Sequence, residues 1–149
     1  MTDFILNRIR CFLFAVIIML VPASCEKEYK SKIPYVYVNI NVAVASYIDL
    51  NVPGNYIYFP QAGFAGVILF CDDIGAYSAY DAGCTYDVST DCSLLEEGAI
   101  EGVTATCPCC GSKYILFGGG YVINGPAVEP LKQYHVQVLD GGGRIRIYN

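Results

Sequence analysis

The segment from Tyr35 to Ala45, YVYVNINVAVA, alternates strictly between two kinds of side chain. Valine or isoleucine occupies every second position, and Tyr, Asn or Ala occupies the positions between. Because successive side chains of a β-strand point to opposite faces, this period of two predicts a strand with one buried face. No segment after residue 24 shows the 3.6-residue period of an amphipathic helix. The sequence therefore predicts an all-β fold.

Several shorter segments fit the same fold. YIYF at 56–59 and VILF at 67–70 are expected strands, and turn sequences rich in Gly and Pro separate them. YHVQV and RIRIY flank the turn LDGGG and predict a closing hairpin. The hairpin side chains expected to face the core are Val136, Val138, Ile145 and Ile147. Many short strands around one core predict an antiparallel sandwich or small barrel.

The first 24 residues are typical of an export signal. Arg8 and Arg10 precede an apolar run, and small residues then lead to Cys25. The run is short for a membrane-spanning helix. Ala23-Ser24-Cys25 resembles a bacterial lipobox, although Pro22 stands where Leu is usual, and ordinary cleavage nearby or an uncleaved anchor is the alternative.

We expect a lipoprotein signal at 1–24, lipidation of Cys25, a polar tether at 25–34 and a β domain at 35–149. The protein is then exported and anchored to a membrane, facing the periplasm or the cell exterior. The formal net charge of −5 lacks the basic footprint of nucleic-acid binding. An exported protein lies where disulfides persist, so its cysteines tend to pair.

Six cysteines follow the tether, and three of them lie in the short segment CPCCGSKY at 107–114. Cys71 ends the VILF strand and is expected to pack in the core. Six cysteines allow fifteen pairings, and spacing alone does not choose among them.

Three stretches resemble the Rieske iron–sulfur domain family. GVILFCDDIGAYSAYDAGCTYD resembles the strands leading into the first cluster loop, and CPCCGSKY resembles the second loop. NGPAVEPLKQYHVQVLDGGGRIRI resembles the proline loop and closing hairpin. The resemblance covers more than half of the chain that follows the signal, and it implies a Rieske-like fold with two cysteine loops that meet under a proline loop.

Rieske proteins bind a 2Fe-2S cluster through two thiolates on one iron and two imidazoles on the other. By this resemblance, Cys84 and Cys107 match the thiolate positions. Tyr86 and Cys110 stand where the two histidines are expected. The single histidine, His135, shares a strand face with Gln137 and is expected to be exposed. The resemblance therefore implies that an ordinary Rieske cluster does not form.

Other parts of the family's site are present. The resemblance implies a disulfide between Cys92 and Cys109 that joins the two loops. It also implies that the hydroxyls of Ser112 and Tyr114 hydrogen-bond the cluster sulfurs. Gly125, Pro126 and Ala127 match the loop that covers the site.

Three functions remain open. The first is electron transfer, with an unknown redox partner, by a 2Fe-2S cluster with altered ligands. The second is a cluster-free binding or assembly module in which Cys84 pairs with Cys107. The third is a zinc site of Cys84, Cys107, Cys110 and one more cysteine. Hydrolytic catalysis is not expected, because a Ser–His–Asp set would depend on His135 alone. The altered cluster's ligands are expected to be Cys84, Cys107 and Cys110, with the phenolate of Tyr86 or the thiolate of Cys92 as the fourth.

Overall fold

The computed structural model describes residues 31–89 and 92–149, and residues 31–149 make up one compact unit. The predicted signal, Cys25 and most of the predicted tether lie outside the described residues. In the described part of the chain, no helix has the length and apolar character needed to cross a membrane. Ile33, at the end of the predicted tether, is buried at 3% exposure, so the chain already packs against the domain there.

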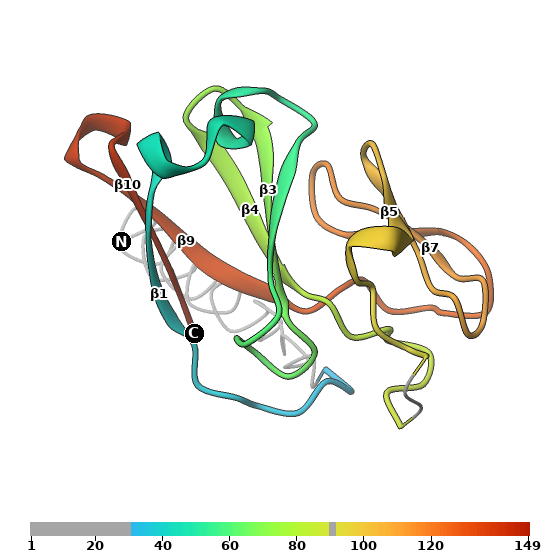
Figure 1. Ribbon diagram of the computed structural model, residues 1–149. Coiled ribbons are helices and arrows are strands. Elements are labelled where there is room, and N and C mark those ends of the chain that lie inside the picture. Colours follow the sequence, from blue (N-terminus) through green and yellow to red (C-terminus); the bar gives the residue numbers. More distant parts are fainter. Residues whose placement is uncertain (1–30, 90–91) are drawn as a thin grey trace, which may run out of the picture. The chain divides into compact units, whose positions relative to one another are not determined.

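All ten strands of the described residues belong to two antiparallel sheets (Figure 1). The larger sheet has the order β1-β10-β9-β4-β3-β2, and it curls into a half-barrel. Its strands are β1 (Asn39–Ala43), β2 (Tyr56–Phe59), β3 (Val67–Asp73), β4 (Ala76–Asp81), β9 (Gln133–Leu139) and β10 (Arg144–Tyr148). The all-β prediction is confirmed.

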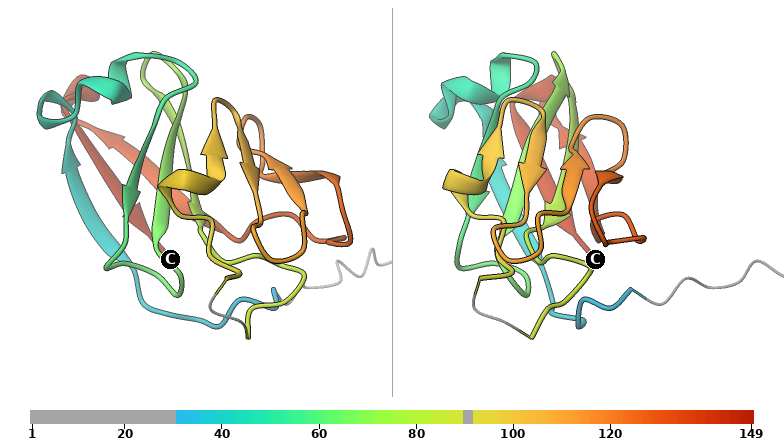
Figure 2. Two further views of the ribbon diagram at one scale, coloured as in Figure 1. Left: turned by 45° about the vertical axis from the view of Figure 1, so that its right-hand side comes forward. Right: turned by 90° about the vertical axis from the view of Figure 1, so that its right-hand side faces the viewer.

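The smaller sheet has the order β5-β6-β7-β8 and lies beside the larger one (Figure 2). Its strands are β5 (Ile100–Glu101), β6 (Thr104–Thr106), β7 (Lys113–Ile115) and β8 (Tyr121–Asn124). The helical segments among the described residues are short 3-10 turns: η1 (Val44–Ser46), η2 (Ile48–Asn51), η3 (Glu97–Ala99) and η4 (Asp140–Gly142).

Strand β3 separates two hydrophobic cores, which explains why VILF is apolar without a break. Ile68 and Phe70 pack in the core that continues into the small sheet. Val67 and Leu69 point to the opposite face and pack in the core inside the curled large sheet. Burial on both faces removes the need for alternation with polar residues.

The predicted strand at 35–45 forms with the expected alternation, but it is shorter. Val38 and Val42 are buried, and the Tyr, Asn and Ala positions between 35 and 45 are exposed. Ladder pairing with β10 begins at Asn39 and ends at Ala43. Before Asn39, the side-chain amide of Asn149 replaces a strand partner, because it accepts from the Val38 N–H at 3.1 Å and donates to the Val36 carbonyl at 2.7 Å.

The closing hairpin forms as β9 and β10, with Ile145 and Ile147 buried and Val136 half-buried. Val138 pairs with the buried Ile145 and so lies on the predicted face, but it is 40% exposed, whereas the other three are buried or half-buried. Strand β4 pairs with β9 only at Gln133 and Tyr134, so the tip of the β9–β10 hairpin extends beyond β4.

Candidate metal centre

Cys107 and Cys110 lie in the tight turn between β6 and β7. Two backbone hydrogen bonds close this turn: Cys107 N–H donates to the Ser112 carbonyl at 2.8 Å, and Gly111 N–H donates to the Cys107 carbonyl at 2.9 Å. Gly111 has φ +73°, a conformation that favours glycine. In this turn, the Cys107 and Cys110 side chains point in the same direction, toward Cys84.

Cys84 lies three residues after β4, and a buried carboxylate holds the chain there. Asp81 is fully buried and accepts hydrogen bonds from the Gly83 N–H at 3.0 Å and the Phe64 N–H at 2.8 Å. It also accepts from the Ala65 N–H at 3.3 Å and from the Tyr134 hydroxyl at 2.6 Å. These bonds satisfy the carboxylate and fix the backbone immediately before Cys84.

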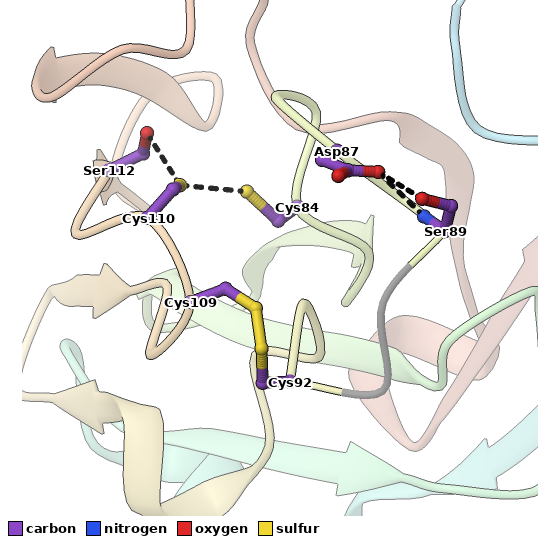
Figure 3. Close-up of a disulfide and its surroundings, with 7 residues drawn as sticks. All are labelled: Cys84, Asp87, Ser89, Cys92, Cys109, Cys110 and Ser112. Carbon is purple, nitrogen blue, oxygen red and sulfur yellow. Dashed lines mark hydrogen bonds between the residues drawn. A yellow bond between two sulfur atoms is a disulfide. The ribbon is translucent and has the colours of Figure 1, made fainter.

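The two loops bring three thiols together, and two of them, Cys84 and Cys110, are drawn in Figure 3. The sulfur atoms of Cys84, Cys107 and Cys110 all lie within 4.8 Å of one another. The Sγ atoms of Cys84 and Cys110 are 3.6 Å apart. Cys84 and Cys107 are buried, at 0% and 1% exposure, whereas Cys110 is half-buried. We call these three residues the thiol trio.

Two hydroxyl groups contact the sulfurs of the trio. The Cys110 thiol lies 3.1 Å from the Ser112 hydroxyl, which also accepts from the Ala127 N–H at 3.0 Å. The Tyr114 hydroxyl lies 3.4 Å from the Cys84 sulfur. Each hydroxyl therefore lies within hydrogen-bonding distance of one cysteine sulfur of the trio, while the predicted contact with cluster sulfurs stays a prediction.

The proline loop lies against Ser112. Gly125 has φ +97°, and a Cβ atom added there would lie 2.5 Å from the Ser112 Cα. Glycine is therefore needed for this close approach. The neighbouring Pro126 is exposed, and Ala127 is buried.

The surroundings shift the pKa values of Cys107 and Cys110 in opposite directions. Burial raises the pKa of the Cys107 thiol to about 12. Burial acts in the same direction at Cys110, but hydrogen bonds with Ser112 and with the other two thiols outweigh it and lower the pKa of Cys110. Burial and the contact with Cys84 raise the pKa of Tyr114. A metal that binds all three sulfurs must therefore displace the proton of Cys107.

The disulfide implied between Cys92 and Cys109 is present (Figure 3). Its two Cα atoms are 5.2 Å apart, and the bond spans 17 residues of sequence. Pairing Cys109 with the first loop holds that loop beside the turn that carries Cys107 and Cys110. The expected pairing of Cys84 with Cys107 in a cluster-free protein is absent, because both are free thiols.

The other candidate residues stay outside the trio. Tyr86 is 49% exposed and makes no hydrogen bond with the three sulfurs in the described part of the chain. His135 is exposed on β9, as predicted, and its ring lies 5.3 Å from the ring of Tyr148. Cys71 is buried, and its thiol donates to the Leu50 carbonyl at 3.3 Å.

A histidine-ligated 2Fe-2S cluster does not fit this site. Tyr86 and Cys110 stand at the two positions where the family has imidazole ligands. His135 lies on β9, outside both cysteine loops. Three clustered thiols suit a soft or borderline ion such as iron, zinc or copper(I). The chemistry that the described residues support is metal binding by sulfur.

Sequence reasoning missed two residues that build the site. Asp81 accepts a hydrogen bond from the Gly83 N–H. Thr85 connects the loop of Cys84 to Tyr114 and to Glu129. The Thr85 N–H donates to the Tyr114 hydroxyl at 3.2 Å, and the Thr85 hydroxyl donates to the Glu129 carbonyl at 2.6 Å. Both residues flank Cys84 closely, but their partners lie far away in sequence, and no local pattern indicated the pairings.

Comparison with known proteins identifies the fold. No protein-family model matches the sequence, and no curated protein matches it either. A chain in the complex of reduced oxygenase and oxidized ferredoxin in carbazole 1,9a-dioxygenase is similar, with 23% identity and a TM-score of 0.51. The match covers 72% of this chain and 99% of that one. The ferredoxin of Sphingomonas yanoikuyae B1 is similar at 22% identity and a TM-score of 0.51, covering 76% of this chain and 99% of that one. The domain has the Rieske-type fold that its cysteine and proline loops predicted.

Proposed function

We propose that the thiol trio binds iron and that the protein transfers single electrons. The observation that carries this proposal is the convergence of Cys84, Cys107 and Cys110, whose sulfurs lie within 4.8 Å of one another. Thiolates are strong ligands for iron, and iron held by thiolates can change its charge by one electron.

The surroundings suit such a centre. Two of the three sulfurs are buried, which limits access of water to the metal. Ser112 and Tyr114 contact sulfurs, and hydrogen bonds to ligand sulfurs tune a reduction potential. The Cys92–Cys109 disulfide links the two loops, so the ligands keep their positions when the charge changes.

The fold also supports the proposal. Both similar structures include proteins named as ferredoxins, one of them in complex with an oxygenase. By analogy, this protein exchanges electrons with a separate redox protein. We further propose that it does so at a membrane surface, after export, with a lipid anchor on Cys25.

The test is the metal content and redox behaviour of the full chain, purified anaerobically. We expect bound iron, visible absorption from sulfur-to-iron charge transfer, and a reversible spectral change on reduction. Cys110→Ser should lose most of the iron, whereas the matched variant Cys71→Ser should keep it, because Cys71 lies outside the trio.

Two results would reject electron transfer. Protein that retains zinc and takes up no iron would be a zinc-binding domain. Protein that binds no metal under anaerobic conditions, with Cys84 and Cys107 oxidised to a disulfide, would be the cluster-free module.

A further inference from the structure

We propose that the trio holds a single metal ion through three thiolates and leaves one coordination position open to a small neutral donor. This inference rests on the proposed function, because it requires that the trio binds metal. It departs from the two-iron centre that the resemblance implies, and it names the class of ligand that the site accepts.

The spacing of the sulfurs supports one ion. A tetrahedral ion with metal–sulfur bonds of about 2.3 Å places its sulfurs about 3.8 Å apart. Cys84 and Cys110 are 3.6 Å apart, and all three pairs fall within 4.8 Å. In a two-iron cluster, Cys84 and Cys110 would be ligands of different irons and would lie farther apart. Here they are as close as two ligands of the same ion.

Among the described residues, no further cysteine, histidine or carboxylate is available as a fourth ligand beside the trio. Cys92 is held in its disulfide with Cys109. The Cys71 thiol on β3 is hydrogen-bonded to the Leu50 carbonyl in η2 and to the Asp73 carbonyl in β3. No histidine or carboxylate of the described chain joins the three sulfurs in a group of ligating atoms. A metal with three protein ligands keeps one position for an exogenous donor.

Charge and exposure indicate which donor that is. A divalent ion with three thiolates carries one net negative charge, in a chain whose own formal charge is −5. Repulsion disfavours an added anion, so water or an uncharged nitrogen base is the preferred donor. Cys110 is the half-buried member of the trio, so a small molecule reaches the metal from its side.

The first part of the test counts atoms in the full chain, purified anaerobically. We expect one metal ion per chain and no acid-labile sulfide. Two irons and two sulfides per chain would overturn this inference while the proposed function stood. Absence of metal from every preparation would overturn both.

The second part uses cobalt(II) in place of the native metal, with imidazole as the probe. Imidazole should shift the visible cobalt bands in a saturable way while the cobalt content stays at one per chain. Cys71→Ser should give the same shift, and Cys110→Ser should abolish it. A spectrum unchanged by imidazole would overturn the open position. The open position would also be overturned if, before imidazole is added, the cobalt spectrum of Tyr86→Phe differed from that of the wild type. Tyr86 would then be the fourth ligand.

Discussion

The three thiols differ in their surroundings although they lie side by side. Cys84 and Cys107 are buried, and Cys110 is partly exposed beside the Ser112 hydroxyl. Hydrogen bonding lowers the pKa of Cys110, whereas burial raises that of Cys107 to about 12. The trio therefore combines one reactive thiol with at least one that holds its proton until metal arrives.

This difference predicts an order of chemical modification. In reduced, metal-free protein at neutral pH, iodoacetamide should alkylate Cys110 before the buried Cys71, Cys84 and Cys107. Ser112→Ala should shift the pH profile of the Cys110 reaction to higher pH, because a donor to the thiolate is lost. Peptide mapping after short exposures gives the order, and Cys107 reacting first would contradict it. Ser89→Ala, at an exposed serine outside the trio, is the control.

The buried pair of Asp81 and Tyr134 gives a second prediction. Tyr134→Phe removes a hydrogen bond to a buried carboxylate and should lower the free energy of unfolding by about 1.5–3 kcal/mol at pH 7. Exposed Tyr37→Phe should change it little. Urea unfolding of both variants measures the difference.

The contribution of the Asp81–Tyr134 pair to stability should decrease at alkaline pH. Burial and the nearby Asp81 raise the pKa of Tyr134, so the folded state holds this proton more tightly. The stabilisation is complete below the unfolded pKa of about 10 and is lost as pH rises toward the folded pKa. The gap between wild type and Tyr134→Phe should narrow above pH about 10, and a constant gap would exclude this linkage.

Among the structural elements, the two cysteine loops depend on a covalent link. The Cys92–Cys109 disulfide joins residues 17 apart in sequence. In the chain-entropy model, opening a loop of this size lowers the free energy of unfolding by about 3 kcal/mol. Cys109→Ser should therefore lower the thermal stability while the metal stays bound at moderate temperature.

Thermal unfolding and metal content of Cys109→Ser check this prediction together. Cys110→Ser is the matched neighbour, and it should lose metal with a smaller loss of stability in the metal-free protein. Metal lost from Cys109→Ser but kept by Cys110→Ser would mean that the roles of these two cysteines are reversed.

Elements were more predictable than the contacts between them. The alternation at 35–45 and the apolar run VILF predicted β1 and β3, because burial of one or both strand faces leaves a local signal. The face of Val138 was predicted correctly, but its exposure was not, since it depends on how far along β9 the pairing with β4 extends.

The residues of the candidate site were likewise more predictable than the contacts between them. The resemblance to the Rieske family implied Cys84, Cys107, Cys110 and the disulfide partners, because the two loops that carry this resemblance are local stretches of sequence. Their arrangement around one point, and the roles of Asp81 and Thr85, depend on hydrogen bonds between residues distant in sequence. Local patterns do not contain that information.

At the scale of the whole molecule, we propose that the first 25 residues determine where the protein lies in the cell. The export segment and Ala23-Ser24-Cys25 predict a mature chain that begins at a lipidated Cys25. Mass spectrometry of the mature N-terminus should find the acyl chains, and Cys25→Ala should release the protein from membranes. An unmodified Cys25, or cleavage elsewhere, would contradict the anchor.

The central claim is that the thiol trio of a Rieske-type fold holds a metal. X-ray absorption at the metal edge of the full chain, purified anaerobically, tests it most directly. We predict a shell of three sulfur atoms at about 2.3 Å that falls to two sulfurs, or disappears with the metal, in Cys110→Ser. A first shell of only oxygen and nitrogen atoms, or a sulfur shell unchanged in Cys110→Ser, would contradict the account.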